Sequence, residues 1–200
     1  LTCGRTSVQE PDEKTYRRYL GCGGLGAYYL LTEVPRGADP LGPENKLIFM
    51  TSPLNGLPLP GVNRYSAVAR SPLTGGFGES EAGGYWGPEL KMAGFDGIVV
   101  EGQAPEPVYL LVRDGQAELR SARDYWGCLA DCVQRGLEEE LGDRRIRVLQ
   151  TGVAGEQGVL YAALVNQLHH FHGRAGLGAV MGAKRLKAIV CRGHGKVEAH

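Results

Sequence analysis

The residues best suited to binding chemistry lie in a glycine-rich stretch between Asn63 and Gly102. Seven glycines fall between Gly75 and Asp96, and glycine lets the main chain bring its N–H groups close to a large flat or anionic ligand. Arg64, near the start of the stretch, adds a cation with a hydrogen-bonding fork. We therefore predict a binding loop for a bulky cofactor, although composition alone favours a glycine-rich Ω-loop that covers a sheet.

A second glycine-rich turn runs from Gly173 to Gly178. Its amides could hold a phosphate at the start of a short helix, with Arg174 pairing to the phosphate and Lys184 adding charge. A close-packed crossing of a helix over a sheet explains the same residues equally well.

Three histidines, His169, His170 and His172, precede this turn. They suggest a metal site, but neighbouring positions on a strand or helix point in different directions. The sequence nearby also offers no Asp, Glu or Cys to complete a ligand set. We predict a polar turn here, and the second interpretation is that His170 or His172 touches a phosphate.

The sequence contains no recognisable catalytic motif of its own. G-x-S-x-G, H-E-x-x-H and Walker patterns are absent, so the isolated chain is expected not to be catalytic. Each carboxylate near the first stretch is expected to be solvated or capping, although Glu81 could bind a divalent ion beside a phosphate. These carboxylates are Glu79, Glu81, Glu89 and Asp96.

Residues 21–26 match the dinucleotide pattern G-x-G-x-x-G. The residues before them are charged and helix-like, whereas a dinucleotide fingerprint follows a buried strand. We therefore predict no nicotinamide binding, and expect the glycines to allow close packing.

The elements that must position these residues follow from periodicity and turn signals. We predict helices near 12–20, at 25–34 and at 131–141, and strands at 46–51, 65–70, 98–101, 108–112, 117–120, 145–151, 159–165 and 187–192. A hairpin turn is expected at Asp114-Gly115. The order helix, strand, strand, glycine-rich turn, strand occurs twice, which predicts an internal repeat of residues 20–102 and 125–193 within one domain. The expected fold is α+β, with two packed sheets, flanking helices and both glycine-rich turns facing one ligand.

Composition excludes several classes of partner. The 200 residues carry 22 basic and 22 acidic side chains, so neither nucleic acid nor an acidic membrane is favoured. The apolar runs are too short to span a bilayer and no secretory leader is recognisable, which predicts a cytoplasmic protein. The five cysteines show no disulfide or zinc spacing and are expected to be free thiols, with Cys128 and Cys132 on one helix face.

Several ordered blocks resemble the N-terminal domain of the aldehyde ferredoxin oxidoreductase family, and the likeness extends from about Leu20 to Gly193. The blocks are PENKL from Pro43, RYS from Arg64, SPLTG from Ser71, GGYWGPELK from Gly83, AGFDGIVVEG from Ala93 and GLGAVMG from Gly176.

The resemblance implies a base for a tungsten, or sometimes molybdenum, ion held by two pterin dithiolenes. In the family, carbonyls from two loops hold a Mg²⁺ that bridges the pterin phosphates, and an arginine at the Arg64 position links a pterin to a 4Fe-4S cluster. The matching positions here are Arg64, Gly83, Gly84, Gly173 and Arg174. The cluster cysteines and the acid–base residues belong to later domains, so the implied partners are those domains or a separate subunit and a ferredoxin-type carrier. A homo-oligomer is possible as well.

Two departures from the family pattern affect the expected cofactor site. Glu81 stands where the family usually has Asn, and His170-Phe171-His172-Gly173 stands where it usually has Arg-Ala-Ala-Gly. The expected cofactor contacts therefore include Glu81, His170 and Phe171. The leading hypothesis is a cofactor-cradling domain or subunit of an oxidoreductase for aldehydes or related acyl substrates. The alternative is a non-catalytic pterin-binding or assembly protein that retains the fold.

Overall fold

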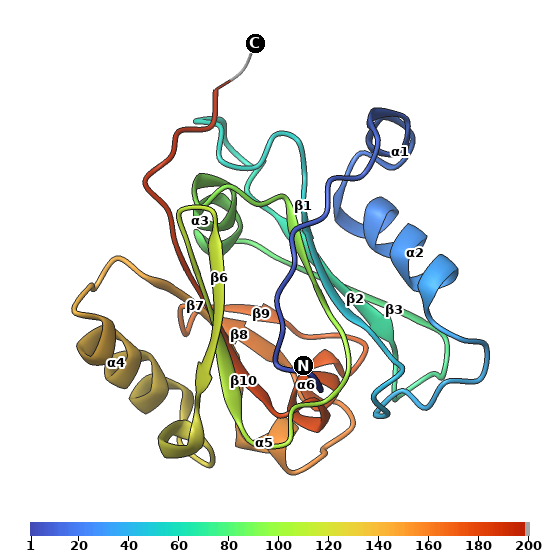
Figure 1. The fold of residues 1–200 in the computed structure, drawn as a ribbon, viewed down its shortest axis with the longest axis vertical. Coiled ribbons are helices and arrows are strands. Elements are labelled where there is room, and N and C mark those ends of the chain that lie inside the picture. Colours follow the sequence, from blue (N-terminus) through green and yellow to red (C-terminus); the bar gives the residue numbers. More distant parts are fainter. Residues whose placement is uncertain (199–200) are drawn as a thin grey trace.

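The computed structural model describes residues 1–198, and within that range the strands form two sheets (Figure 1). The first sheet is antiparallel and has the order β3 (Phe77–Ala82), β2 (Tyr65–Arg70), β1 (Leu47–Thr51), β4 (Gly97–Val100). The second has the order β6 (Gln116–Ser121), β5 (Val108–Arg113), β10 (Leu186–Arg192), β7 (Arg147–Thr151), β8 (Leu164–Asn166), β9 (His170–His172). In the second sheet β10 pairs with β5 in parallel.

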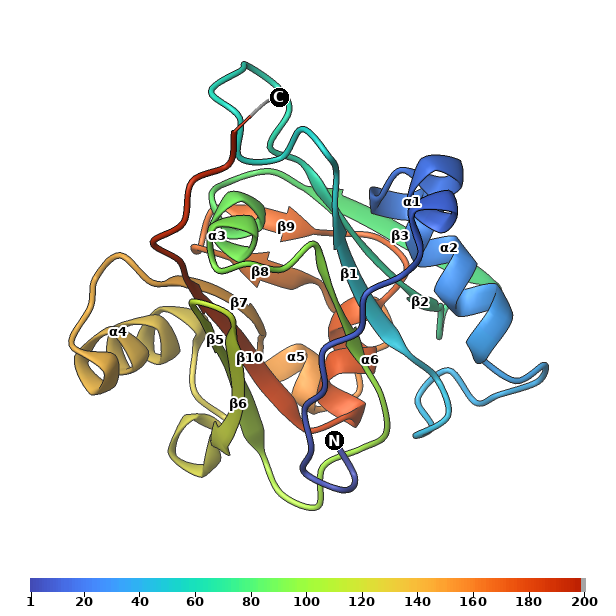
Figure 2. The same cartoon turned by 45° about the horizontal axis from the view of Figure 1, so that its top comes forward.

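Helices lie both between the sheets and outside them (Figure 2). They are α1 (Glu13–Tyr19), α2 (Cys22–Glu33), α3 (Trp86–Met92), α4 (Ala130–Leu141), α5 (Val153–Glu156) and α6 (Leu177–Ala183), with a 3-10 turn at Arg123–Tyr125. The predicted α+β fold with two packed sheets is confirmed. Across residues 1–198, every helix is too short or too polar to cross a bilayer.

Trp86, at the start of α3, joins the two sheets. Its ring is fully buried, with its centroid 4.7 Å from that of Tyr65 and 5.7 Å from that of Phe49, both in the first sheet. Its indole N–H donates to the carbonyl of Ile189 in the second sheet at 3.1 Å. A large aromatic ring that buries its apolar body and satisfies its one donor is a strong anchor.

Each sheet is also covered on its outer face by a helix. On the first sheet, α2 packs Leu25 and Leu30 against Ile48. On the second, α4 packs Val133 and Leu137 against the outward side of the sheet. Because β1 and β10 are covered on both faces, every residue in them is buried, which explains their continuous apolar sequences.

Two groups of four strands share one topology. The first unit, β1 to β4, has the order β3-β2-β1-β4, and the second unit, β7 to β10, has the order β9-β8-β7-β10. All neighbours within both units are antiparallel, and in each unit a short helix, α3 or α6, precedes the last strand. This arrangement supports the proposed internal repeat.

Residues 75–96 form regular elements rather than the long loop that glycine content predicted. They contain β3 and α3. Gly75, Gly84 and Gly94 stand at turns, with φ of +69°, +89° and +95°, where glycine is favoured. Gly87 lies within α3, where an added Cβ would be 3.1 Å from the Tyr65 ring. These glycines therefore form the turns between short elements and allow those elements to pack closely.

The structure also tests three smaller predictions. The Asp114-Gly115 hairpin turn is confirmed, with φ of +45° and +81°. The predicted strand at 159–165 is wrong in extent, because residues before Leu164 turn after α5 and hydrogen-bond locally. The shared helix face of Cys128 and Cys132 is also wrong, since α4 begins at Ala130.

Charged side chains are buried where elements meet. Lys187 in β10 pairs with Glu156 in α5, and both side chains have 0% exposure. Glu89 in α3 accepts from Arg192 at 2.9 Å. This ion pair corrects the expectation that Glu89 is solvated, because its position on the inward face of α3 leaves it 8% exposed.

Candidate functional site

The edge strands β3 and β9 of the two sheets meet along a line that we call the seam, residues 77–85 and 170–176. His172 Nδ1 lies 2.7 Å from the Ser80 carbonyl oxygen. The Arg174 backbone N–H donates to Ser80 Oγ at 3.3 Å. The turn after β9 is therefore held by β3, although these residues are far apart in the sequence.

Asn166, in the second unit, hydrogen-bonds to residues of the first unit. Its Nδ2 donates to Tyr65 Oη at 2.9 Å and to the Gly83 carbonyl at 3.1 Å. Beside it, Gln167 Oε1 accepts from the Tyr85 backbone N–H at 2.9 Å. The second unit therefore holds the turn after β3, and the two turns brace one another.

The strand registers relate positions in the two turns. In the first unit, Met50 pairs with Ser66, which in turn pairs with Glu81. In the second unit, Gln150 pairs with Val165, which in turn pairs with Phe171. Counted from these strands, Glu81 corresponds to Phe171, Gly83 to Gly173 and Gly84 to Arg174.

Arg64 lies beside the first turn. Its Nε donates to Glu81 Oε2 at 3.1 Å, and the two side chains are 59% and 44% exposed. The Arg64 carbonyl accepts from Asn55 Nδ2 at 2.8 Å, which fixes the main chain from which the guanidinium extends. Burial raises the pKa of the nearby Cys22 thiol, and the charge of Glu81 adds to the effect.

The glycines of the two turns have different surroundings. Gly84 has φ of +89°, and an added Cβ would lie 2.6 Å from His170 Cδ2 and 2.8 Å from Asn166 Oδ1. At Gly83 the nearest atom would be His170 Nδ1, at 4.0 Å, and at Gly173 an added Cβ would meet open space as far as the described residues go. Main chain is thus accessible at Gly83 and Gly173, as approach by a large ligand requires.

His170 and His172 lie in strand β9, whereas His169 lies in the turn before it, so the predicted polar turn is wrong for two of the three histidines. Alternation along the strand buries His172, leaves His170 partly buried and leaves Phe171 56% exposed. Burial lowers the pKa of His172 to about 4. No group of three or more His, Cys, Asp or Glu among residues 1–198 could hold a metal ion.

Two buried acceptors lie under the seam. His172 Nε2 and Asn166 Oδ1 have no hydrogen-bond partner within the described part of the chain. Since Nδ1 of His172 faces a carbonyl, the neutral ring carries its proton there and presents a lone pair at Nε2.

Lys184 does not add charge to the second turn, in contrast to the prediction. It is 1% exposed and donates to the carbonyls of Asn45 and Gly102, the latter at 2.9 Å. Burial lowers its pKa to about 8. Residues 21–26 also lie away from any dinucleotide arrangement, because helix α1 precedes them and α2 begins at Cys22.

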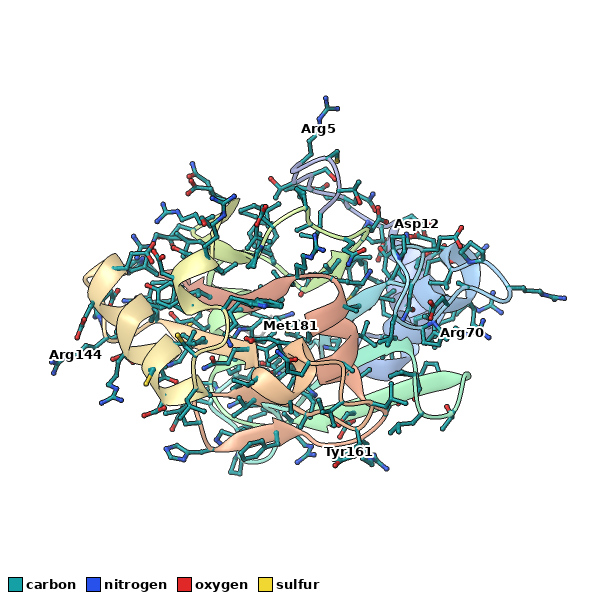
Figure 3. All side chains as sticks on the ribbon, turned by 90° about the horizontal axis from the view of Figure 1, so that it is seen from below. Arg5, Asp12, Arg70, Arg144, Tyr161 and Met181 are labelled. Carbon is teal, nitrogen blue, oxygen red and sulfur yellow. The ribbon has the colours of Figure 1, made fainter. Side chains whose placement is uncertain are left out.

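Two exposed tyrosines are Tyr85, within the seam, and Tyr161, in the turn after α5. Tyr85 is 63% exposed, and Arg147 lies over its ring at 5.5 Å from the centroid. Tyr161 is 75% exposed and extends from the surface, whereas Met181 is buried inside the molecule (Figure 3). All eight residues predicted to contact a cofactor thus lie at or beside one accessible edge.

Sequence reasoning missed the residues that hold this edge together. Ser80, Asn166 and Tyr65 are fully or almost fully buried, and their contacts join segments from different units. The tripeptide Arg64-Tyr65-Ser66 drew attention to Tyr65, but the register of β8 and β9 was needed to find its partner.

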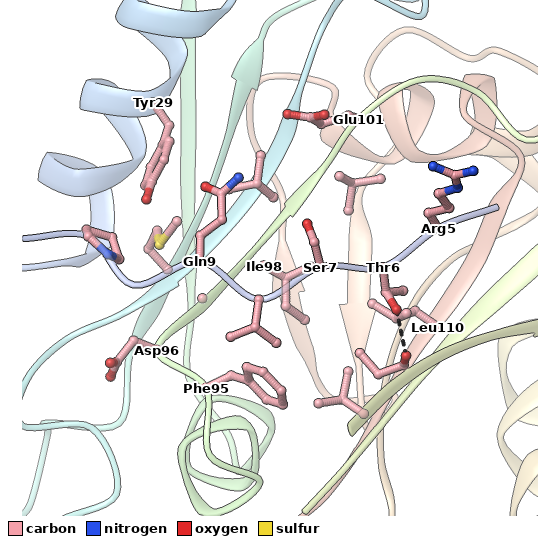
Figure 4. A pocket seen from close by; sticks show the side chains of 18 of the residues that line it. Arg5, Thr6, Ser7, Gln9, Tyr29, Phe95, Asp96, Ile98, Glu101 and Leu110 are labelled. Atoms are coloured by element: carbon pink, nitrogen blue, oxygen red, sulfur yellow. Dashed lines mark hydrogen bonds between the residues drawn. The ribbon is translucent and has the colours of Figure 1, made fainter. Parts of the chain in front are cut away.

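A groove of about 720 Å³ lies elsewhere, beneath the N-terminal segment (Figure 4). Its lining includes Ile98 and Phe95 from the β4 side and Leu110 from β5. Thr6 Oγ1 donates to the Ala117 carbonyl at 3.0 Å and ties the segment to β6. These residues lie at the opposite sheet edges from β3 and β9, so the groove is separate from the seam.

Comparisons with known proteins agree with this architecture. A family model described as aldehyde ferredoxin oxidoreductase, N-terminal domain, matches residues 1–193. A protein of Pyrococcus abyssi named tungsten-containing aldehyde ferredoxin oxidoreductase is 46% identical over 198 residues, which cover 99% of this chain and 33% of that protein. A Pyrococcus furiosus protein named aliphatic sulfonate oxidoreductase, WOR-like subunit, is 36% identical over 210 residues, covering 98% of this chain and 33% of that protein.

A solved structure extends the likeness to coordinates. It is described as the active site complex BamBC of benzoyl coenzyme A reductase with 1,5 dienoyl-CoA, and it matches with a TM-score of 0.95 and 39% identity. The match covers 98% of this chain and 30% of that chain. The chain thus spans about a third of the length of its relatives.

Proposed function

Because this chain belongs to the aldehyde ferredoxin oxidoreductase family, we propose that its seam seats a tungsten bis-pterin cofactor. The chain would form the cofactor-cradling part of an oxidoreductase for aldehydes or related acyl substrates. Molybdenum is the second metal that this proposal admits. When bound, the metal centre supplies the redox chemistry, and the residues of this chain bind and orient it.

The observation that carries the proposal is the mutual bracing of two turns. Asn166 of the second unit holds the Gly83 carbonyl, and Ser80 of the first unit holds the Arg174 N–H. A ligand with two similar halves matches such a pair of turns, because each half can meet equivalent main chain.

Some of the side chains at the seam suit a phosphate-bearing ligand, and one does not. Arg64 and Arg174 are cationic and lie at the two sides of the seam, and the main chain at Gly173 is open. Guanidinium groups bind phosphate strongly. Glu81 is the exception, since its carboxylate repels a phosphate unless a cation intervenes. We propose that a Mg²⁺ held by carbonyls of the two turns is that cation.

Within this proposal, each seam residue has a role. Arg64 links a pterin to the cluster of a further domain, and Arg174 binds a phosphate. Gly83, Gly84 and Gly173 admit the ligand, and the side chains of Glu81, His170 and Phe171 line the seat. The exposed rings of Tyr85 and Phe171 exclude water once a further domain or subunit covers them.

The remaining machinery lies outside this chain in the proposal. The family relationship favours a 4Fe-4S cluster in other domains or a separate subunit, and a ferredoxin-type electron carrier. A homo-oligomer and a cytoplasmic location also belong to this proposal.

Metal and pterin content of the full-length protein tests the proposal. After expression with tungstate, elemental analysis should find tungsten, and mass spectrometry should find released pterin in a twofold molar ratio to the metal. Reduction of a viologen dye should depend on added aldehyde. A correctly folded, fully assembled protein with neither metal nor pterin would contradict the proposal.

A non-catalytic pterin-binding or assembly protein is the second candidate. Glu81 and the His170-Phe171-His172 segment favour it, because they replace a neutral residue and an arginine of the family pattern with groups that bind phosphate less well. A preparation that binds pterin but shows no metal and no aldehyde-dependent dye reduction would identify this function.

A further inference from the structure

The chain after β10 crosses from the second unit to the first. Residues 193–197, which we call the strap, run past α3 to the loop at residues 53–63 (Figures 1 and 2). The strap touches α3, the β5–β6 hairpin and this loop in turn. These contacts differ in strength along its length.

A buried ion pair holds the root of the strap. The Gly193 N–H and Arg192 Nη1 both donate to Glu89 Oε1 at 2.9 Å. An added Cβ at Gly193 would lie 2.2 Å from the backbone nitrogen of Ala93, so glycine is needed for the strap to pass this close to the end of α3. Because breaking a buried, hydrogen-bonded ion pair is costly, the root stays attached.

Weaker contacts hold the middle of the strap. The Gly195 N–H donates to the Met92 carbonyl at 3.0 Å. The His194 N–H donates to Asp114 Oδ1 at 2.9 Å, and His194 Nδ1 lies 2.9 Å from Asp114 Oδ2. The two side chains are 59% and 44% exposed, and exposed pairs contribute little to stability. The strap can therefore be released locally beyond its root while the rest of the fold persists.

The tip of the strap packs on a glycine of the loop. Gly56 has φ of +93°, and an added Cβ there would lie 2.8 Å from Val197 Cγ2. Glycine thus leaves the space that the half-buried Val197 occupies. The Gly56 N–H donates to Asn63 Oδ1 at 2.9 Å, so Val197 covers the point at which the loop closes on itself.

Asn55 connects this point to Arg64. Its side chain is fully buried, and its Nδ2 donates to the Arg64 carbonyl at 2.8 Å. On the other side, an added Cβ at Gly87 of α3 would lie 3.0 Å from Asn55 Oδ1. The loop is therefore packed between the strap and α3, and it fixes the main chain from which the Arg64 guanidinium extends.

We propose that the strap holds the loop at residues 53–63 in place, and that Val197 is thereby a positioning residue for Arg64. When the tip is docked, Asn55 keeps its hydrogen bond to the Arg64 carbonyl. When the tip is released, the loop opens while β10 stays folded. Since the contacts are linked, whatever fixes Arg64 also favours the docked strap. The inference goes beyond the proposed function, because it concerns contacts within this chain and holds for any ligand of the seam.

Hydrogen exchange of the full chain tests this role. Val197→Asp places a carboxylate against the main chain of Gly56 and should release the tip. The amides of residues 55–57 are hydrogen-bonded, and we expect them to exchange about three- to tenfold faster, the effect of losing one partly buried aliphatic contact. Val197→Ile retains the contact and should keep the wild-type rates. The amides of β10 should not change in either variant.

Trypsin cleavage after Arg64 reports on the main chain at Arg64 itself. Val197→Asp should raise the rate of this cleavage by a similar factor, relative to cleavage after Arg36 in a separate exposed turn. Val8→Asp is the matched control, because Val8 is an exposed valine of the N-terminal segment, and it should leave both rates unchanged. Wild-type exchange at residues 55–57 in Val197→Asp, wild-type cleavage after Arg64, or an equal acceleration of exchange in β10 would overturn the inference.

Discussion

The first and second units share strand order and pairing direction but differ in the side chains at their meeting edges. The edge strand β3 carries Glu81, which is paired with Arg64, whereas β9 carries Phe171 on the corresponding outward position and His172 on the inward one. The comparison shows that main-chain geometry can be repeated while charge is not. The seam therefore offers a nearly symmetric backbone with an asymmetric electrostatic surface.

The units also differ at their other ends. In the second unit β10 continues the sheet by pairing with β5, whereas β4 ends the first sheet at the groove beneath the N-terminal segment. Extra pairing and a buried ion pair make the second unit the more strongly enclosed of the two. Mutations should reveal this difference.

The largest effect is expected at Lys187, which is enclosed in the second unit. Lys187→Met would leave Glu156 charged and buried with its partner removed, at a cost of about 3–5 kcal/mol in the free energy of unfolding. Urea denaturation measures this loss. The double variant Lys187→Met with Glu156→Leu should recover much of it, and a single variant as stable as wild type would contradict the expected burial.

The next effect is a pH dependence at His172. Its folded-state pKa of about 4 lies below the ordinary value of 6.5, so the unfolded chain binds more protons between these values. Stability should fall as the pH drops from about 6.5 to 4, by up to about 3 kcal/mol, and this contribution should then level off.

His172→Gln removes this titration while retaining an N–H donor for the Ser80 carbonyl. Denaturation curves across the same pH range should show a smaller decline than in wild type. His194→Gln is the control, because His194 is exposed and pairs with Asp114. A decline of equal size in wild type and His172→Gln would show that another group is responsible.

The two turns can be compared through their glycines. Gly84→Ala should destabilise by about 1–3 kcal/mol, because a positive φ and close contacts to His170 and Asn166 both oppose a Cβ. Gly173→Ala meets open space and should change stability by less than about 0.5 kcal/mol. Under the proposed function, however, Gly173→Ala should lower the tungsten retained per chain. Equal stability losses in the two variants would contradict the different surroundings of the turns.

A smaller effect is expected at Asn166, which corresponds by register to Ala67 of the first unit. Asn166→Ala removes the donor from the Gly83 carbonyl and from Tyr65 Oη, which should cost about 1–2 kcal/mol. Hydrogen exchange at residues 83–85 should accelerate at the same time. Unchanged exchange there would show that Asn166 does not brace the turn.

Local sequence patterns predicted most of the regular elements. The apolar run of β1, the alternation in β2 and the hairpin β5–β6 were all recognisable, because each depends on neighbouring residues. The extent of β8 was not, since its three residues carry too little periodicity. Residues 75–96 were misjudged because glycines needed for turns and close packing resemble glycines in a loop.

The candidate site was predictable as a set of residues but not as an arrangement. Motif blocks identified Arg64 and Gly83, and the second glycine-rich turn identified Arg174. Burial of Lys184, Glu89 and His172 was not foreseen, because a charged or polar side chain in the sequence gives no sign of the partners that can enclose it.

The sequence by itself determined the family, the order of the elements and the two glycine-rich turns, since these depend on local composition and on the spacing of residues along the chain. Tertiary structure decided that β3 meets β9, that Asn166 holds Gly83 and that Glu81 faces Arg64. The physical reason is that such contacts depend on strand register and packing between segments distant in the sequence, which no local period encodes.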